Sequence, residues 1–174
     1  MKNLIKILAI FAVTLGFAAS SYGQESANAD ASATIITPIA IAWAADMNFG
    51  NVAVQSSTGG TVILAPGGGR STGGAGGATL PAFNTGTVTA ASFTVSGTAD
   101  YTYVITLPST NVVISDGTNT MNVNAFTSTP TPTGTLDGTG YQTLNVGATL
   151  NVAAAQPAGT YTLDDGIEVT VNYN

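Results

Sequence analysis

The chain has 174 residues, of which 44% are hydrophobic and only 7% are charged, far below the roughly 25% charged residues of soluble globular domains. Its formal net charge is −6, and two of its three basic residues, Lys2 and Lys6, lie at the extreme N-terminus, which leaves Arg70 alone against nine acidic side chains. Binding to nucleic acid or to an anionic membrane surface requires clustered Lys and Arg, so the composition excludes both.

The charged start is followed by an apolar run over residues 7–17 and then by small residues. A transmembrane anchor would need roughly 20 apolar residues, whereas this run is shorter and is interrupted by a Thr and a Gly. The pattern is typical of a signal peptide, predicted over residues 1–23 with cleavage before Gln24 and a rival site at 27–29. We therefore predict an exported protein without a transmembrane anchor, which crosses the inner membrane and the periplasm to the cell surface or the medium.

Residues 24–174 are predicted to form one domain, which begins with alternating apolar positions. Ala31, Ala33 and Ile35 alternate first, Thr37-Pro38 interrupts, and Ile39, Ile41 and Trp43 resume on one face. Since proline cannot donate to a strand ladder, Pro38 favours an edge strand or a bulge. Trp43 shares the face of two isoleucines and is predicted to be a core residue.

A Gly-rich segment over residues 66–77 follows, with Arg70 inside it. A nucleotide-binding phosphate loop would require a Lys after the glycines and a strand and a helix on either side. No Lys occurs beyond residue 6. The segment is therefore predicted to be a mobile surface loop.

The rest of the chain alternates period-two apolar stretches with turn residues, which predicts short β-strands and no helix. The apolar positions of these stretches are Ala91, Phe93 and Val95, then Tyr101, Tyr103, Ile105 and Leu107, then Val112 and Ile114, then Met121 and Val123. The clearest strand covers residues 144–152, and the last covers 167–173 after the turn signal at 164–166. Many short strands without helices favour an all-β fold, an antiparallel β-sandwich of the immunoglobulin-like kind.

The residue types that catalysis most often uses are missing. Without His and Cys, neither Ser-His-Asp or Cys-His nucleophile activation nor a zinc site built on imidazole or thiolate is possible. Asp164, Asp165 and Glu168 form the only close acidic group, and their places in a turn and on a polar strand face are typical of solvated residues. We predict no enzyme and no catalytic, cofactor-binding or metal-binding residues, with a calcium site left as an open alternative.

Three blocks of the sequence resemble a known family. They are residues 34–51 with Asp46-Met47-Asn48-Phe49-Gly50-Asn51, the strand over 144–152, and Pro157-Ala158-Gly159-Thr160-Tyr161 followed by Val169-Thr170-Val171-Asn172-Tyr173. Together they are similar to the secreted bacterial family catalogued as domain of unknown function 4402. That family is similar in turn to chaperone–usher pilins and to spore-coat-protein-U-like subunits, which share a Phe-Gly and a penultimate Tyr, here Phe49-Gly50 and Tyr173.

The resemblance implies an incomplete immunoglobulin-like sandwich, which a strand from a periplasmic chaperone and then from the next subunit completes. Ile167, Val169, Val171 and Tyr173 are then the candidate chaperone-contact strand, and Ala31, Ala33 and Ile35 the candidate subunit-contact strand. The chain lacks the cysteine pair common in such pilins. We expect a structural or adhesive cell-surface subunit, pilin-like and fimbrial. The alternative is a self-contained secreted binding or adhesion module whose ligand loop is the Gly-rich segment.

Overall fold

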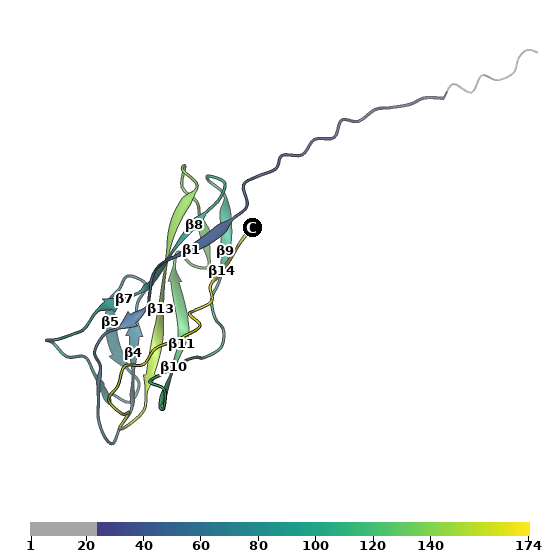
Figure 1. Ribbon diagram of the computed structural model, residues 1–174. Helices are drawn as coiled ribbons and strands as arrows, with labels where there is room; N and C mark the ends of the chain where they lie inside the picture. The colour runs from purple at the N-terminus through teal and green to yellow at the C-terminus, as the bar shows by residue number, and fades with distance from the viewer. Residues whose placement is uncertain (1–23) are drawn as a thin grey trace, which may run out of the picture. The chain divides into compact units, whose positions relative to one another are not determined.

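The computed structural model describes residues 24–174, so the signal peptide predicted over 1–23 lies outside the described residues. The chain divides into two units, Met1–Ile35 and Ile36–Asn174. In the first unit, residues 24–35 contain no strand or helix. The second unit holds every strand of the described chain (Figure 1).

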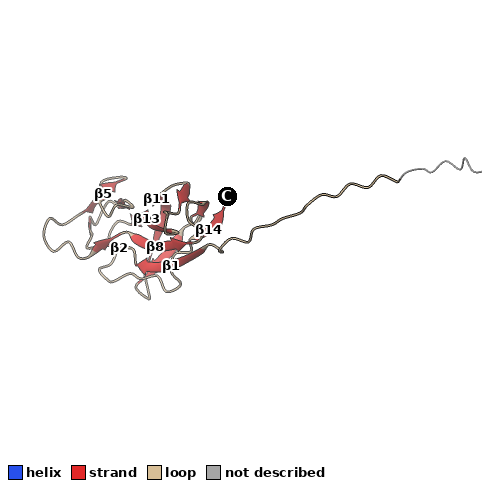
Figure 2. Cartoon of the chain, turned by 90° about the horizontal axis from the view of Figure 1, so that it is seen from above, coloured by secondary structure: helices blue, strands red, loops and turns tan. Residues whose placement is uncertain are grey.

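The strands are β1 (Ala40–Ala45), β2 (Asn48–Phe49), β3 (Ala53–Val54), β4 (Gly60–Leu64), β5 (Arg70–Gly73), β6 (Ala78–Thr79), β7 (Val88–Thr89), β8 (Ala91–Ser96), β9 (Thr102–Thr106), β10 (Val112–Ser115), β11 (Thr120–Thr129), β12 (Thr133–Thr135), β13 (Tyr141–Val152) and β14 (Thr170–Tyr173). All their pairings are antiparallel. No helix occurs in residues 24–174, as Figure 2 shows. The prediction of an all-β, antiparallel chain is confirmed.

The longest strand, β13, organises the main sheet, whose order is β1-β8-β13-β11-β10. β11 pairs with one edge of β13. The other edge pairs with β8 through residues 141–146 and then with β4 through 148–152. Gly147 lies at the position of β13 where the neighbouring strand changes from β8 to β4. A Cβ at this residue would lie 2.1 Å from the carbonyl oxygen of Leu64. Only glycine fits this close approach of two backbones.

A second sheet has the order β12-β9-β14, and two short pairs, β2-β7 and β3-β6, complete the strand pairing. The first hydrophobic cluster is built by residues from both larger sheets, which include Val95 of β8, Ile105 of β9 and Leu144 of β13. The second cluster surrounds Leu150 of β13 and Val123 of β11. Phe126 packs against both clusters, because the register of β11 shifts between Asn124 and Thr127 and redirects its side chain.

One polar pair lies beside the first cluster. The hydroxyl of Tyr103, which is 0% exposed, donates to Oε1 of Gln142 at 2.7 Å. Burial raises the pKa of Tyr103 above its usual value. Gly134 leaves room for the ring, since a Cβ at that position would lie 2.3 Å from Tyr103 Cζ. The core therefore accepts a phenol because its hydroxyl is paired.

Acidic side chains close the turns. Asp116, between β10 and β11, accepts hydrogen bonds from the amides of Thr118 at 2.9 Å and Asn119 at 2.6 Å. These hydrogen bonds lower the pKa of Asp116 to about 2, and the bond from the Asn119 backbone amide has the largest effect. Hydrogen bonds led by the one from the Thr139 side chain likewise lower the pKa of Asp137. These carboxylates stabilise turns as acceptors of local N–H groups.

The structure corrects three predictions about single segments. Trp43 is 67% exposed and not a core residue, because the register of β1 shifts between Trp43 and Ala45 and breaks the alternation there, and its indole N–H donates to Oδ1 of Asp46 at 2.9 Å. The Gly-rich segment 66–77 is not all loop, since β5 forms inside it and pairs with β4. The last strand begins at Thr170 and not at Ile167.

Candidate functional site

The strands of the described chain carry almost no charge. All nine acidic residues lie outside them, and Arg70 of β5 is the single charged side chain within a strand. Charged side chains on edge strands normally prevent the pairing of one sheet with another. Two edge strands, β1 of the main sheet and β14 of the second sheet, carry no charged side chain, and the one irregularity of β1 is the register shift between Trp43 and Ala45.

The free edge of β1 exposes backbone groups of its apolar residues. β1 pairs only with β8. The amide of Gly97 donates to the carbonyl of Gly140 at 2.9 Å, so by alternation the odd residues of β8 face β13 and its even residues face β1. Ala40 and Ala42 bond to those even residues, which leaves the N–H and C=O groups of Ile41 and Trp43 directed to the open side.

The free edge of β14 has the same character. β14 pairs only with β9, and the amide of Asn174 donates to the carbonyl of Thr102 at 3.3 Å. Alternation therefore turns the backbone groups of Val171 and Tyr173 to the open side. Their side chains pack against the first cluster beside Val169, which is 8% exposed. Both edges thus combine unpaired backbone groups with partly buried apolar side chains.

The hydroxyl of Tyr173 ties the two edge strands together at one end. It accepts a hydrogen bond from the amide of Thr98 at 2.7 Å and donates to the carbonyl of Thr37 at 2.8 Å. The amide of Thr37 donates to Oγ1 of Thr98 at 3.0 Å. Gly97 makes room for this arrangement, because a Cβ there would lie 2.2 Å from the hydroxyl. The start of β1 and the end of β14 are therefore fixed beside each other by one phenol.

The candidate contact residues predicted from the sequence divide between the two units. Val171 and Tyr173 lie in β14 on its free edge, while Ile167 and Val169 precede that strand. Ala31, Ala33 and Ile35 lie outside every strand and are exposed, Ile35 by 92%. Their contact with another chain stays a prediction. β1 was not among the predicted contact strands, although Pro38 correctly indicated its edge position.

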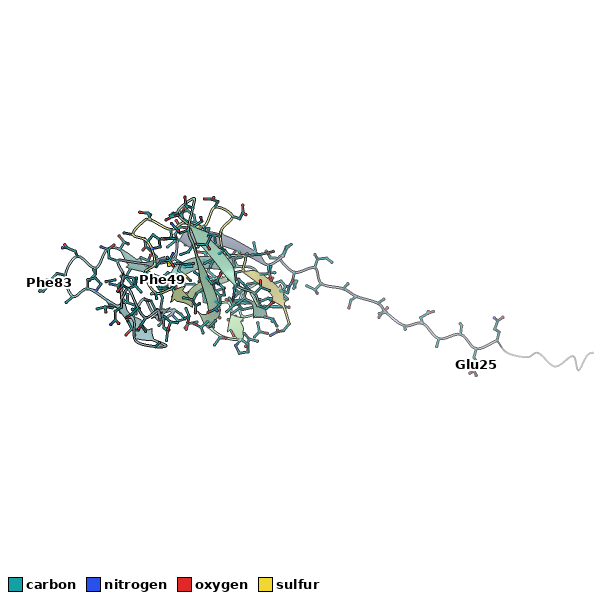
Figure 3. The ribbon with its side chains drawn as sticks, turned by 90° about the horizontal axis from the view of Figure 1, so that it is seen from below. Glu25, Phe49 and Phe83 are labelled. Atoms are coloured by element: carbon teal, nitrogen blue, oxygen red, sulfur yellow. The ribbon has the colours of Figure 1, made fainter. Side chains whose placement is uncertain are left out.

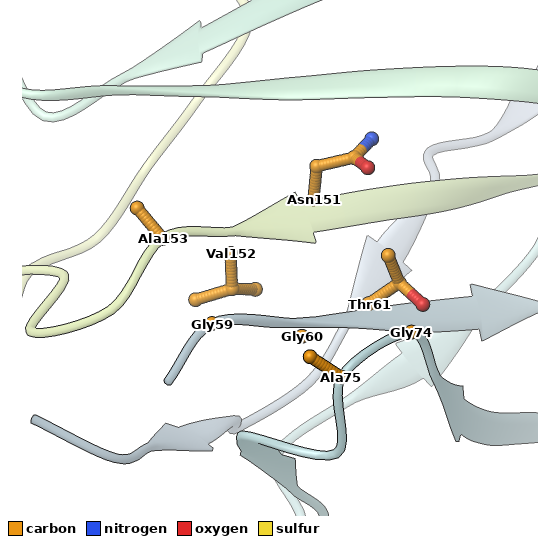
Figure 4. Close-up of a pocket in the computed structure, with 8 residues that line it drawn as sticks. All are labelled: Gly59, Gly60, Thr61, Gly74, Ala75, Asn151, Val152 and Ala153. Atoms are coloured by element: carbon orange, nitrogen blue, oxygen red, sulfur yellow. The ribbon is translucent and has the colours of Figure 1, made fainter. Parts of the chain in front are cut away.

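A shallow depression of about 410 Å³ lies where β4 begins and β13 ends, beside the turn that follows β5 (Figure 4). It is lined by Gly59, Gly60, Thr61, Gly74, Ala75, Asn151, Val152 and Ala153. The side-chain amide nitrogen of Asn151 already donates to the backbone carbonyl of Asn122 and to Oδ1 of Asn124. The lining offers neither a charge nor an acid–base group, so it does not provide the groups that catalysis requires.

Within residues 24–174, no cluster of three acidic, His or Cys side chains is placed to hold a metal ion. The same part of the chain has no helix that is long and apolar enough to cross a membrane.

Comparison with known proteins adds a family assignment. The family model described as "Domain of unknown function (DUF4402)" matches residues 39–173, which covers nearly all of the second unit. No curated protein and no solved structure matches the chain.

Proposed function

Because the chain belongs to the family described as domain of unknown function DUF4402, whose description assigns no activity, we propose its function from its free strand edges. It is a structural subunit of the cell surface that assembles, in the manner of pilins, by receiving a β-strand from another chain. Catalysis has no part in this function. The observation that carries the proposal is the pair of uncharged edges on β1 and β14.

An added strand would gain stability in two ways at either edge. Its backbone would pair with the open groups of Ile41 and Trp43 or of Val171 and Tyr173, and its apolar side chains would cover the residues that now lie half-buried beside the first cluster. The gain from covered apolar area is about 25 cal/mol per Å². The first cluster takes residues from both larger sheets, which supports an immunoglobulin-like β-sandwich that lacks one strand.

The same reasoning leads to the proposed partners and place of action. Unprotected edges favour aggregation. A periplasmic chaperone would keep the subunit monomeric during export by pairing with β14 at Val171 and Tyr173. The next copy would then supply its segment before Pro38. The exposed Ala31, Ala33 and Ile35 alternate in that segment, as the inward residues of an added strand must.

The test of assembly uses charge at one position of the N-terminal segment. The Ile35→Asp change would place a carboxylate against apolar side chains, where an unpaired charge is strongly disfavoured. We expect wild-type protein, co-expressed with a periplasmic chaperone, to form ladders that resist SDS without boiling, and Ile35→Asp to remain monomeric. Because Ile35 is 92% exposed, the variant itself should fold normally, as its circular dichroism would show.

Thr34→Asp is the matched control, since it adds the same charge one residue earlier on the opposite face of an added strand. It should form ladders like the wild type. Monomeric wild-type protein under these conditions would contradict the proposal and favour the self-contained binding module. Equal assembly of the two variants would show that Ile35 is not buried in the contact.

A further inference from the structure

The loop that joins β6 to β7, residues 80–87, presents the most exposed aromatic side chain of the described chain. Phe83 is 86% exposed and lies at the tip of this loop (Figure 3). We call the segment the Phe83 loop. Single exposed apolar side chains are normal on protein surfaces. The contacts that hold this loop therefore decide whether Phe83 is a candidate binding residue.

The base of the Phe83 loop is fixed by the one basic side chain among residues 24–174. The guanidinium of Arg70 donates to the carbonyls of Phe49, of Asn51 at 2.9 Å and of Thr85 at 3.2 Å. The amide of Asn51 donates to the carbonyl of Thr85 at 2.7 Å, and its side chain donates to the carbonyl of Asn84 at 2.7 Å. The backbone next to Phe83 is therefore held before any partner arrives, which lowers the entropy cost of ordering the loop on binding.

The surroundings of Phe83 are polar but uncharged. Asn84, Thr85 and Thr87 are exposed beside it, and the loop contains no acidic or basic residue. The guanidinium of Arg70 at the base of the loop directs donors to the carbonyls of Phe49, Asn51 and Thr85. The net acidity of the chain repels anionic lipids and polyanions. An aromatic face with amides and hydroxyls at its rim matches a ligand with apolar C–H faces and hydroxyl edges.

We propose that the Phe83 loop binds an uncharged carbohydrate, with a sugar ring stacked on Phe83 and its hydroxyls bonded to the neighbouring amide and hydroxyl side chains. The loop lies at the end of the second unit away from the C-terminus in both Figure 1 and Figure 2. A strand added to β14 therefore leaves it open. One ring gives weak binding, and a fibre that repeats the loop converts it into avid attachment.

The test is affinity electrophoresis of the purified monomeric chain in native gels that contain dextran, konjac glucomannan or xyloglucan. At least one of these neutral polysaccharides should retard the wild type. Phe83→Ala should weaken the retardation about tenfold, as loss of a stacked anchor does. Tyr141→Ala is the matched control, because Tyr141 is another exposed aromatic, at 54%, outside the loop, and it should be retarded like the wild type.

Every result of this experiment bears on the proposal. Absence of retardation by all three polysaccharides overturns it, and so does equal retardation of Phe83→Ala and wild type. Flotation of the wild type, but not of Phe83→Ala, with phosphatidylcholine vesicles would assign the loop to a lipid surface instead. Because the monomer is used, failure here leaves strand-mediated assembly untouched.

Discussion

Replacing Gly147 by Ala should unfold the domain or leave it with little stability. A Cβ at this position would lie 2.1 Å from the carbonyl oxygen of Leu64 and 2.7 Å from the carbonyl carbon of Ala65. Both are backbone atoms, so β4 and the chain after it would have to move. Overpacking of a core costs about 1–3 kcal/mol, and more where the backbone must shift. We expect a loss of at least about 3 kcal/mol, measured by denaturant titration followed by circular dichroism.

Gly67→Ala is the matched control, since it makes the same chemical change in the turn that follows β4. Nothing lies within 4 Å of a Cβ built there, so the midpoint of unfolding should stay near the wild-type value. A Gly147→Ala protein as stable as Gly67→Ala would mean that β8 and β4 do not meet β13 at this residue.

Replacing Leu150 by Ala should have the second large effect. Leu150 is 3% exposed in the second cluster, and its neighbours across the sheet are Val123 of β11 and Val62 of β4. Truncation of a buried leucine leaves a cavity and costs about 2–5 kcal/mol. The free energy of unfolding, from urea titration with an unchanged m-value, measures this loss.

Thr149→Ala, one residue earlier on β13, tests the register. Its side chain lies on the opposite face, so only strand propensity and contacts with neighbouring strands are lost, which amounts to less than about 1 kcal/mol. Similar losses at Leu150 and Thr149 would contradict the register, because a shift by one residue exchanges the two faces of a strand.

The strand at β13 could be predicted because its pattern is local. Leu144, Val146, Ala148, Leu150 and Val152 alternate along it, and all five are buried. The final strand was predicted too long, since residues 167–169 continue the apolar alternation but pairing with β9 begins only at Thr170. Period-two patterns thus predict which face is inward more reliably than where a strand begins.

The sequence could not show where a strand departs from regular alternation. Trp43 follows the inward alternation of Ile39 and Ile41, and that periodicity predicts a core position. The register of β1 shifts between Trp43 and Ala45, and the indole N–H bonds to Asp46. The exposure of Trp43 therefore accompanies an irregularity of the strand, which period-two alternation does not predict.

Two further features were missed for a related reason. β4 contains Val62, Ile63 and Leu64 in succession, and it pairs with both β13 and β5. The Phe83 loop owes its form to Arg70, which lies 15 residues before Thr85. Hydrogen bonds from one side chain to the backbone carbonyls of distant turns produce no periodic pattern in the sequence.

The emission of Trp43 tests the central claim, that β1 and β14 receive a strand, most directly. It is the only tryptophan of the chain, it is 67% exposed, and its backbone faces the free edge of β1. In SDS-resistant oligomers of the wild type, a strand beside β1 should cover the indole. The account predicts a shift to shorter wavelength and weaker acrylamide quenching than in monomeric Ile35→Asp. Oligomers whose Trp43 emits and is quenched like that of the monomer would contradict strand addition at this edge.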